Sequence, residues 1–352
     1  MAAGRLLLPE WSPQSGVLLA WPHEGTDWAR DLEAAEAAWT ALAAAIAGFE
    51  PVLVICADAA HRRHVRQRLA AAGVTPDRLR LVEHRVDDTW TRDYGPLCVA
   101  EAGRVRLVDF AFNGWGGKFP AARDDAASRR LHAAGCFGDT PLERVELVLE
   151  GGALDTDGAG TALTTRSCLL NPNRALPGGA PPDKPLLETR LRTHLGLRRV
   201  IWLEHGRLAG DDTDGHVDML ALFCSPAVVA HAACDRAADE HHAPLARMAE
   251  ELARALADGP RPVRLVPLPL PAPVRDEDGR RLPATYVNFL ILNGAVLVPA
   301  YGDPADELAL RRLRGCFPGR RVIPVDCRVL IRQGGGLHCA ALQLARGVLA
   351  KE

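Results

Sequence analysis

Near its C-terminal end the chain reads Phe289-Leu290-Ile291-Leu292-Asn293-Gly294-Ala295-Val296-Leu297-Val298, with an asparagine–glycine pair between two apolar runs. Asn-Gly readily adopts the left-handed backbone conformations of a tight hairpin turn, so the stretch predicts two antiparallel strands between Asn288 and Tyr301. A doubly wound sheet, the alternative α/β arrangement, predicts single strands that alternate with helices. This hairpin therefore argues for a different α/β fold.

Three earlier segments repeat the plan of strand, tight turn and second strand. They run from Gly95 to Phe110 with a turn at Glu101-Ala102-Gly103, from Gly151 to Thr165 with a turn at Asp157-Gly158, and from His216 to Ala232 with a turn near Ser225-Pro226. The four hairpins begin at residues 95, 151, 216 and 288, which are 56, 65 and 72 residues apart. Such recurrence is typical of repeats that bury their apolar faces against each other.

Between the hairpins the sequence predicts helices and further single strands. We expect helices over residues 30–48, 58–72, 184–195, 234–258 (interrupted near Pro244) and 303–313, and strands over 52–56, 79–83, 145–150, 200–204, 263–268 and 321–326. Glycines at 48, 73 and 196, Asp58 before a helix and Pro304 at a first helical turn supply the boundaries. The unit is thus ββαβ. About five units account for residues 1–352 as one α/β domain.

The residues that could carry chemistry recur at matching places in these units. Asp93 and Glu150 lie just before the first two hairpins, His216 and Asp218 at the start of the third, and Asn288 at the start of the fourth. Cys339 begins the last strand, which we expect to complete the first unit by pairing with residues 16–21. Equivalent positions of units that surround an axis converge on it. The periodicity therefore predicts one central site.

Cys339 and His216 are the candidate catalytic pair. The thiol follows three glycines, where backbone can approach a ligand closely. A thiol and an imidazole can form a covalent catalyst. On a strand, His216 and Asp218 point to the same face. A small residue after a bend and two edge residues facing water are the purely structural alternatives.

Several carboxylates suggest that the ligand is a cation. Asp93 lies in a tight loop, where it bonds either its own backbone or a ligand. Glu150 ends an apolar strand and needs a partner, for which His216 is a candidate. The run Asp211-Asp212-Thr213-Asp214 is either a solvated acidic loop or the lining of a cation pocket, and the ring face of Trp90 suits a cation or an aliphatic chain.

Composition limits the other classes of function. The net charge of −2 provides no basic field, so nucleic acid is not an expected partner. The nine cysteines include no C-x-x-C pair, which favours buried thiols in a reducing compartment. Leu6-Leu7-Leu8 is too short for a signal peptide or a membrane span, so we predict a cytoplasmic protein. The acidic loop with His216 lacks the ligand spacing of a metal site, and Gly114-Trp115-Gly116-Gly117-Lys118 lacks a phosphate-loop pattern.

In combination these motifs resemble one known family. Trp90-Thr91-Arg92-Asp93-Tyr94-Gly95-Pro96, Glu150-Gly151-Gly152, Gly215-His216-Val217-Asp218, Asn288-Phe289 with Asn293-Gly294, and Gly335-Gly336-Leu337-His338-Cys339 occur in the order found in the agmatine deiminase and bacterial-type peptidylarginine deiminase family. The resemblance spans residues from about 10 to 345. It implies a five-bladed α/β propeller with pseudo-fivefold symmetry, and hydrolysis of a guanidine to a urea and ammonia without a cofactor.

The resemblance also implies a role for each site residue. Cys339 is the nucleophile, His216 carries protons, Glu150 orients His216, and Asp93 and Asp218 hold the guanidinium. Trp90, Asp212, Asp214 and Asn288 are further candidates for substrate binding. The chain departs from the family at Leu337, where asparagine is common, and at Ala340-Ala341-Leu342, which follow the cysteine.

The expected substrate is free agmatine, a small guanidine with a second cation. Its products would be N-carbamoylputrescine and ammonia. Free arginine, peptidylarginine, transfer of the amidino group to an amine, and a non-catalytic propeller that only binds are the alternatives. A homodimer also stays open.

Overall fold

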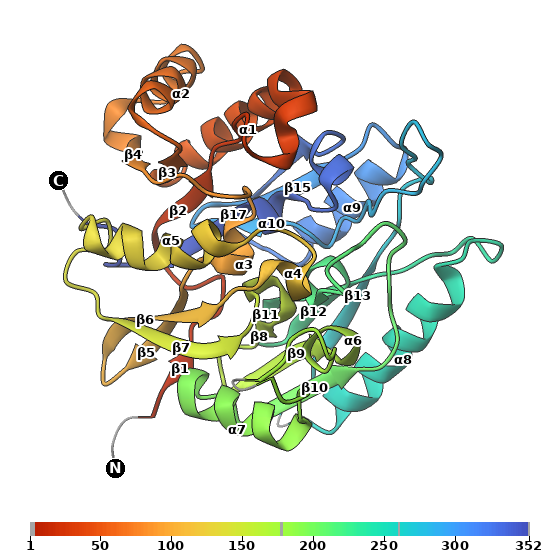
Figure 1. Cartoon of the computed structure of the whole chain (residues 1–352). Coiled ribbons are helices and arrows are strands. Elements are labelled where there is room, and N and C mark those ends of the chain that lie inside the picture. Colours follow the sequence, from red (N-terminus) through yellow and green to blue (C-terminus); the bar gives the residue numbers. More distant parts are fainter. Residues whose placement is uncertain (1–3, 177–178, 260, 351–352) are drawn as a thin grey trace.

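Small mixed sheets, each with at least one antiparallel pair, dominate the molecule (Figure 1). The computed structural model describes residues 4–176, 179–259 and 261–350, and in these ranges the strands form five sheets of three or four strands. By sheet, the strands are β1 (Leu6–Leu7), β5 (Leu97–Glu101), β6 (Arg104–Ala111) and β7 (Leu142–Val148); β8 (Asp155–Thr156), β9 (Thr161–Thr165) and β10 (Arg199–Leu203); β11 (Ala221–Ser225), β12 (Val228–Ala232) and β13 (Arg264–Leu268); β14 (Leu290–Ile291), β15 (Ala295–Ala300) and β16 (Arg321–Asp326); β17 (Ala341–Ala345), β2 (Gln14–Ala20), β3 (Val52–Cys56) and β4 (Leu79–Glu83).

The pairing follows the predicted ββαβ plan in every sheet. An antiparallel pair is extended by a parallel strand in β5-β6-β7, β8-β9-β10, β11-β12-β13, β14-β15-β16 and β17-β2-β3. A parallel crossover needs a long connection, which is usually a helix. The connecting helices are α5 (Ala122–Ala133), α7 (Lys184–Leu195), α8 (His242–Ala257), α9 (Ala305–Arg314) and α1 (Leu32–Ala47), while α2 (Ala59–Ala71) leads to β4.

The fifth sheet joins the two ends of the chain, as predicted. Strand β17 pairs antiparallel with β2, so that Ala341 lies opposite Leu19. The C-terminal strand thereby completes the first unit. This pairing brings the segment before β17, which holds Cys339, to the same place as the other repeats.

Most element boundaries agree with local sequence signals. Asp58 accepts hydrogen bonds from the backbone of Ala60 and His61 at the start of α2, and Gly196 ends α7 in a left-handed conformation with φ of 70°. Helix α8 is an exception, because it begins at His242 rather than at residue 234. Its Pro244 lies in the first turn, where the missing N–H is harmless, and does not interrupt the helix. Helix α5 and the short β1 were not predicted.

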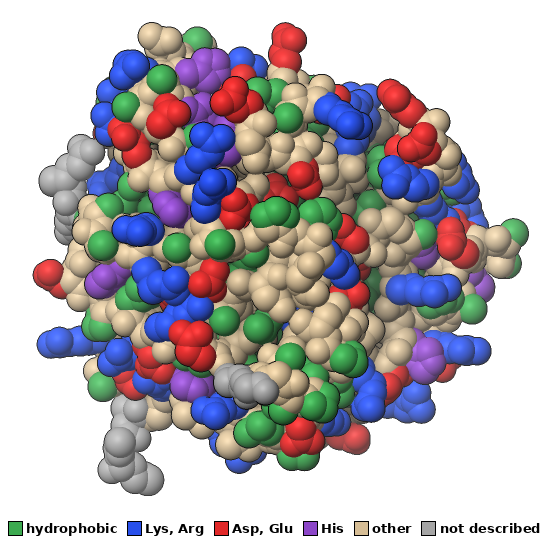
Figure 2. All heavy atoms as spheres, viewed as in Figure 1, with side chains coloured by type: hydrophobic (Ala, Val, Ile, Leu, Met, Phe, Trp, Pro, Cys, Tyr) green, Lys and Arg blue, Asp and Glu red, His purple; other side chains and the backbone are tan. Residues whose placement is uncertain are grey.

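Two apolar clusters form the interior. The larger draws on most of the sheets and includes Trp21, Trp28 and Trp39, and the smaller lies between β5–β7, β9 and α7. On the face shown in Figure 2, acidic and basic side chains are intermingled. In the ranges given above, no helix combines the length and apolar character that crossing a membrane requires.

Short segments that precede four different sheets meet in the middle of the molecule. They are α3 (Thr91–Tyr94) before β5, the turns of 3-10 helix Gly151–Ala153 before β8 and Val217–Met219 before β11, and α10 (Leu337–Ala340) before β17. Helix α3 contacts both α10 and Gly151–Ala153, which in turn contacts Val217–Met219. The predicted convergence of equivalent positions is therefore observed. Two further short helices, α4 (Gly114–Gly117) and α6 (Arg166–Leu169), follow β6 and β9.

Candidate active site

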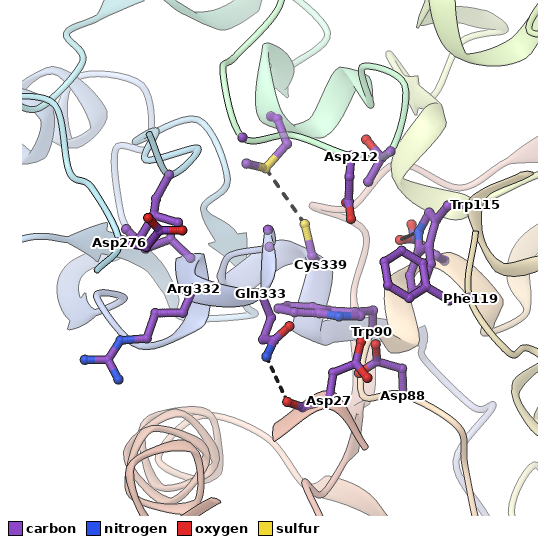
Figure 3. Close-up of a pocket in the computed structure, with 18 of the residues that line it drawn as sticks. Asp27, Asp88, Trp90, Trp115, Phe119, Asp212, Asp276, Arg332, Gln333 and Cys339 are labelled. Carbon is purple, nitrogen blue, oxygen red and sulfur yellow. Dashed lines mark hydrogen bonds between the residues drawn. The ribbon is translucent and has the colours of Figure 1, made fainter. Parts of the chain in front are cut away.

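A cavity of about 330 Å³ opens above these converging segments. Trp90, Asp93, Asp212 and Cys339 of the predicted site residues line it, together with Trp115 and Phe119 (Figure 3). His216, Asp218, Glu150 and Asn288 lie behind this lining, each at most 1% exposed. Asp214 lies outside it. The site residues thus divide into those that face the cavity and those that support them.

Cys339 is at the floor of the cavity and 6% exposed. It lies in the single turn of α10, two residues before β17, and not at the start of the strand as predicted. Its Sγ is 3.5 Å from Asp218 Oδ2 and 3.2 Å from Asn288 Nδ2. Burial, followed by the charges of Asp218 and Asp93, raises the pKa of the thiol well above its usual value. Burial and the two carboxylates therefore favour the neutral thiol over the thiolate.

Asn288 holds the cysteine from behind. Its Oδ1 accepts hydrogen bonds from the backbone N–H of His338, at 2.9 Å, and of Cys339, at 3.3 Å. A Cβ on Gly336 would come within 2.5 Å of this oxygen, which explains a glycine at that position. Asn288 is therefore placed to position the thiol, and a contact between Asn288 and the substrate stays a prediction.

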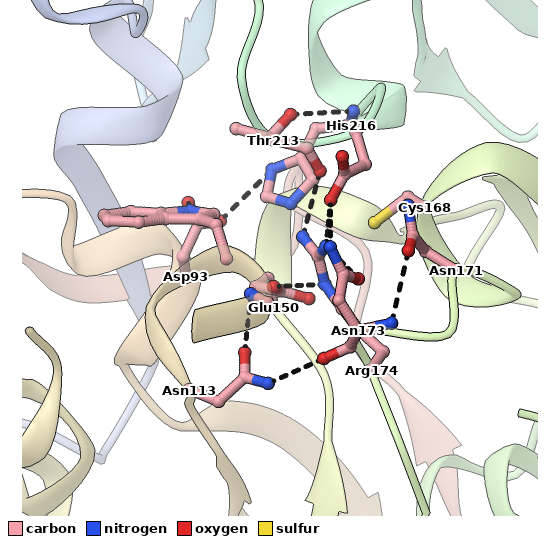
Figure 4. A network of polar contacts seen from close by, with 12 residues as sticks. Asp93, Asn113, Glu150, Cys168, Asn171, Asn173, Arg174, Thr213 and His216 are labelled. Atoms are coloured by element: carbon pink, nitrogen blue, oxygen red, sulfur yellow. Dashed lines mark hydrogen bonds and ion pairs between the residues drawn. The ribbon is translucent and has the colours of Figure 1, made fainter. Parts of the chain in front are cut away.

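Asp93 and His216 face each other (Figure 4). Asp93 Oδ1 is 3.6 Å from His216 Nδ1 and accepts a hydrogen bond from the Gly152 N–H at 3.0 Å, while Oδ2 accepts one from Trp115 Nε1 at 2.9 Å. Burial raises the pKa of Asp93 to about 6, although the charge of His216 counters it in part. Burial alone would keep His216 neutral, but Asp93, together with Cys168 and Glu150, raises its pKa well above the usual value.

The surroundings of Gly152 show how closely the side chains of Asp93, His216 and Asp218 pack together. A Cβ placed on this glycine would lie 2.7 Å from Asp93 Oδ1, 2.7 Å from His216 Nδ1 and 3.0 Å from Asp218 Oδ2. The three side chains therefore surround one point. His216 and Asp218 share this surface although they lie on a 3-10 turn, Val217–Met219 with its N-cap, and not on the predicted strand.

Glu150 belongs to a buried ion-pair network behind His216 (Figure 4). Its Oε1 accepts a hydrogen bond from Arg174 Nε at 2.9 Å, and its Oε2 has no hydrogen-bond partner among the described residues. Arg174 also pairs with Asp214, which contacts Lys118 Nζ at 2.8 Å. The prediction that Asp214 borders the substrate pocket finds no support in this placement, because Asp214 holds Arg174 instead.

Glu150, His216 and the Cys168 thiol also form a cluster of metal-ligand types. Their ligand atoms all lie within 4.8 Å of one another, and all three residues are buried. However, the guanidinium of Arg174 is bonded to Glu150. A divalent cation there would be repelled by this neighbouring positive charge. The only carboxylate of the cluster is thus already neutralised by Arg174.

The mouth of the cavity carries charges of both signs, but they are unequally paired. Among the described residues, the carboxylates of Asp27, Asp88 and Asp212, here called the acidic mouth, take part in no ion pair. By contrast, the arginines that line the cavity are all paired: Arg281 with Asp239 at 2.7 Å, Arg280 with Asp276 at 2.9 Å and Arg332 with Asp31 at 3.3 Å. The charges at the mouth that lack an ion-pair partner among the described residues are thus negative.

Trp90 forms the wall between floor and mouth. In Figure 3 its ring lies between Cys339 on one side and Asp27 and Asp88 on the other. The ring packs with Trp28, at 5.9 Å between centroids, and with Trp39, at 6.2 Å. A Cβ on Gly335 would lie 2.4 Å from the ring. The glycine run thus lets the segment before Cys339 pass directly against Trp90.

Sequence reasoning missed several residues of this site. Trp115 lies in the glycine-rich segment that was set aside, where φ values of 68°, 54°, 90° and 79° from Gly114 to Gly117 turn the indole toward Asp93. Asp88 is adjacent to the motif that begins at Trp90. Only the tertiary structure brings Arg174, from the loop after α6, to Glu150.

Comparisons with known proteins agree with this geometry. Residues 6–344 match the family described as Porphyromonas-type peptidyl-arginine deiminase. An agmatine deiminase of Stutzerimonas stutzeri (strain A1501) is 38% identical over 364 residues, which cover 97% of this chain and 95% of that protein. One from Ectopseudomonas mendocina (strain ymp) is 37% identical and covers 95% and 94%.

Solved structures are similar over the same length. A cysteine-to-serine variant of the C. jejuni agmatine deiminase with substrate bound has a TM-score of 0.89 and 35% identity, covering 98% of this chain and 97% of that one. The agmatine deiminase of Enterococcus faecalis has a TM-score of 0.87 and 29% identity, with coverage of 98% and 97%.

Proposed function

The chain belongs to the Porphyromonas-type peptidyl-arginine deiminase family, a hydrolase family acting on C–N bonds of guanidino groups, and on this basis we propose that it converts agmatine and water to N-carbamoylputrescine and ammonia with Cys339 as the nucleophile. One observation carries the proposal. The Cys339 thiol lies 3.5 Å from Asp218, and the carboxylates of Asp93 and Asp218 meet His216 around a single point.

The two aspartates would bind the planar guanidinium and place its carbon near the sulfur. Asp218 Oδ1 is buried and accepts no hydrogen bond from a described residue, so it is available for such a contact. Carboxylates bind a guanidinium through paired, charge-assisted hydrogen bonds. Correct placement of the reacting atoms then lowers the entropic part of the barrier.

The bound cation would also activate its own nucleophile. In the empty site the charges of Asp93 and Asp218 disfavour the thiolate. A guanidinium between them neutralises this repulsion, so the thiol loses its proton to solvent and the thiolate attacks the guanidinium carbon. The raised pKa of His216 makes its ring the proton donor for the departing ammonia.

Two steps complete the reaction. Collapse of the tetrahedral adduct breaks one C–N bond, releases ammonia and leaves an S-alkylthiouronium on Cys339. His216, now neutral, takes a proton from water as the water oxygen attacks the same carbon. The C–S bond then breaks and the sulfur leaves as a thiolate, while the hydroxyl of the adduct gives up its proton to solvent and the product is released as a urea.

The charge distribution at the mouth supports agmatine over free arginine. Agmatine ends in an ammonium, whereas arginine adds a carboxylate. The acidic mouth offers unpaired carboxylates to an ammonium, while Arg280, Arg281 and Arg332 are each bound by an acidic partner and are less free to bind a carboxylate. Of the two acidic-loop aspartates predicted to bind the substrate, Asp212 lines the cavity and Asp214 does not.

We also infer the arrangement and the setting of the protein. The five ββαβ sheets would surround a central axis as the blades of a pseudo-fivefold propeller, with the cavity at the axis, and the chain would form one catalytic domain. The same proposal covers a cytoplasmic location and no cofactor. Whether two copies form a homodimer stays a prediction to be tested by sedimentation.

Steady-state kinetics test the proposal. Agmatine, arginine, methylated arginines and a peptidylarginine are compared by release of ammonia and of the ureido product. We expect the highest kcat/KM with agmatine. A higher kcat/KM with arginine or with the peptide would reject agmatine as the substrate, but it would leave the proposed deiminase reaction intact. Amidino transfer predicts little ammonia in the presence of an acceptor amine, and a non-catalytic propeller predicts no product with any guanidine.

A further inference from the structure

His338, directly before the nucleophile, lies between two carboxylates. Its Nδ1 is 2.8 Å from Asp218 Oδ2, its Nε2 is 2.6 Å from Glu10 Oε1, and its side chain is 1% exposed. A carboxylate can only accept hydrogen bonds, and a neutral imidazole carries a single N–H. Both contacts are hydrogen bonds at the same time only when both ring nitrogens are protonated. The geometry is therefore that of an imidazolium.

The groups around His338 alternate in charge. Behind it, Glu10 pairs with Arg92 at 3.0 Å and accepts a hydrogen bond from Gln343 Nε2 at 3.1 Å. Arg92 Nε also donates to the His338 carbonyl at 3.3 Å. Burial and the positive charge of Arg92 oppose protonation of the ring, yet Glu10 and Asp218 raise the pKa of His338 above its usual value.

Asp155 is a further ionisable neighbour of Glu10, but it contributes little negative charge near pH 7. Asp155, on β8, lines a second cavity of about 60 Å³ together with Glu10 and Arg92. Burial and the charge of Glu10 raise the pKa of Asp155 to about 8, so it is largely neutral near pH 7. Arg92, Glu10, His338 and Asp218 therefore form a continuous row of charges that ends at the sulfur of Cys339.

We propose that Glu10 holds His338 as an imidazolium and that His338 thereby keeps Asp218 ionised and oriented for the guanidinium. His338 is then a positioning residue, which acts through Asp218. Asp218 Oδ2 contacts both the ring and the thiol, and this leaves Oδ1 without a protein partner among the described residues. The inference rests on the proposed function, in which Asp218 binds the substrate.

The pH profile of kcat/KM tests this role. A cation at this distance lowers the pKa of an aspartate by about 1–3 units. Its removal should raise the pKa of Asp218 toward that of Asp93, which is about 6 and sets the acid limb in the wild type, and should thereby shift this limb upward and steepen it. We expect this shift in His338→Gln, and a smaller one in Glu10→Gln. His231→Gln is the matched control, because His231 is a buried histidine on β12 that bonds a backbone carbonyl. Its profile should match that of the wild type.

A merely structural role would give a different result. Loosened packing lowers kcat/KM by the same factor at every pH, so a His338→Gln profile parallel to that of the wild type overturns the proposal. Urea denaturation midpoints of the variants show separately how much stability each substitution costs.

The charge of the ring can be read without turnover. In ¹⁵N spectra of the whole protein, the His338 signals are those that disappear in His338→Gln. We expect imidazolium shifts near pH 7 in the wild type and neutral-ring shifts in Glu10→Gln. A neutral ring in the wild type overturns the inference even when agmatine is hydrolysed. A charged ring without turnover of any guanidine supports the pairing with Glu10 and rejects only the proposed function.

Discussion

The floor of the cavity and its mouth are built in opposite ways. On the floor, the ionisable side chains are buried and come from segments that lead into strands of four different sheets. At the mouth, Asp88 and Asp212 come from loops and Asp27 begins the 3-10 helix Asp27–Asp31, and Asp27 and Asp212 are exposed. Fixed dipoles and charges suit bond making, because they need no reorganisation during the reaction. Loop carboxylates with free charge suit selection of the substrate. Changes on the floor should therefore act on kcat, and changes at the mouth on KM.

The largest expected effect is that of removing the nucleophile. Cys339→Ala should lower kcat by at least about 10⁴-fold, because covalent catalysis is lost while the substrate site stays intact. Ammonia release gives the rate, and circular dichroism checks the fold. Cys56→Ala is the matched control, since Cys56 is a fully buried thiol on β3 outside the cavity lining. Near-native activity of Cys339→Ala would show that the mechanism is wrong.

Neutralising either floor aspartate should come next. Asp93→Asn and Asp218→Asn keep the shape and remove the charge, at a cost of about 2–5 kcal/mol in transition-state binding, or roughly 30- to 5,000-fold in kcat/KM. Asp109→Asn is a suitable control, because Asp109 is 1% exposed on β6 and pairs with Arg129 and Arg144 away from the cavity. Unchanged kcat/KM in both floor variants would contradict the guanidinium clamp.

The same contrast explains what could be predicted from sequence. Floor residues lie at equivalent places in a repeat whose hairpin turns, such as Asn293-Gly294, are visible as local signals. Their convergence followed once the units were recognised. Local conformation was less predictable, because Cys339 and His216 were expected on strands and lie on short helical turns. A single turn before a strand leaves no periodic pattern.

The residues of the mouth do not occupy equivalent places in the repeat. Asp27, Asp88 and Asp212 come from unrelated segments of the chain, and nothing local distinguishes them from solvated aspartates. Asp212 was predicted as a ligand, but so was Asp214, two residues later. Only the structure separates them, because it places the Arg174 and Lys118 charges against Asp214. Long-range pairing of this kind is invisible in one sequence.

A smaller effect is expected at the mouth. Asp88→Asn should lower kcat/KM for agmatine on the order of tenfold, mainly through KM, because one charged contact to the ammonium is lost. Butylguanidine, which lacks that ammonium, should be affected little. Asp276→Asn should change kcat/KM for agmatine by less than about twofold, because Asp276 is already paired with Arg280 at the surface. Equal losses for both substrates in Asp88→Asn would place Asp88 outside the recognition of the distal amine.

The smallest expected effect is a pH dependence that belongs to the mouth alone. Burial, with help from the charge of Asp27, raises the pKa of Asp88 to about 7. As the pH falls through this value, Asp88 takes up a proton and loses its attraction for an ammonium, whereas the ammonium of agmatine stays charged. Asp93, whose pKa is raised to about 6, affects every guanidine in the same way. The effect of Asp93 therefore cancels in the ratio of kcat/KM for agmatine to kcat/KM for butylguanidine.

We expect this ratio to fall as the pH is lowered from about 8 to 6, by roughly tenfold at most for a single titrating group. Protonation neutralises the same carboxylate as Asp88→Asn does, so the fall cannot exceed the effect of that variant, and in the variant the ratio should be flat. A ratio that stays constant in the wild type would mean that the acidic mouth does not bind the ammonium of agmatine. The preference for agmatine would then have to come from the floor.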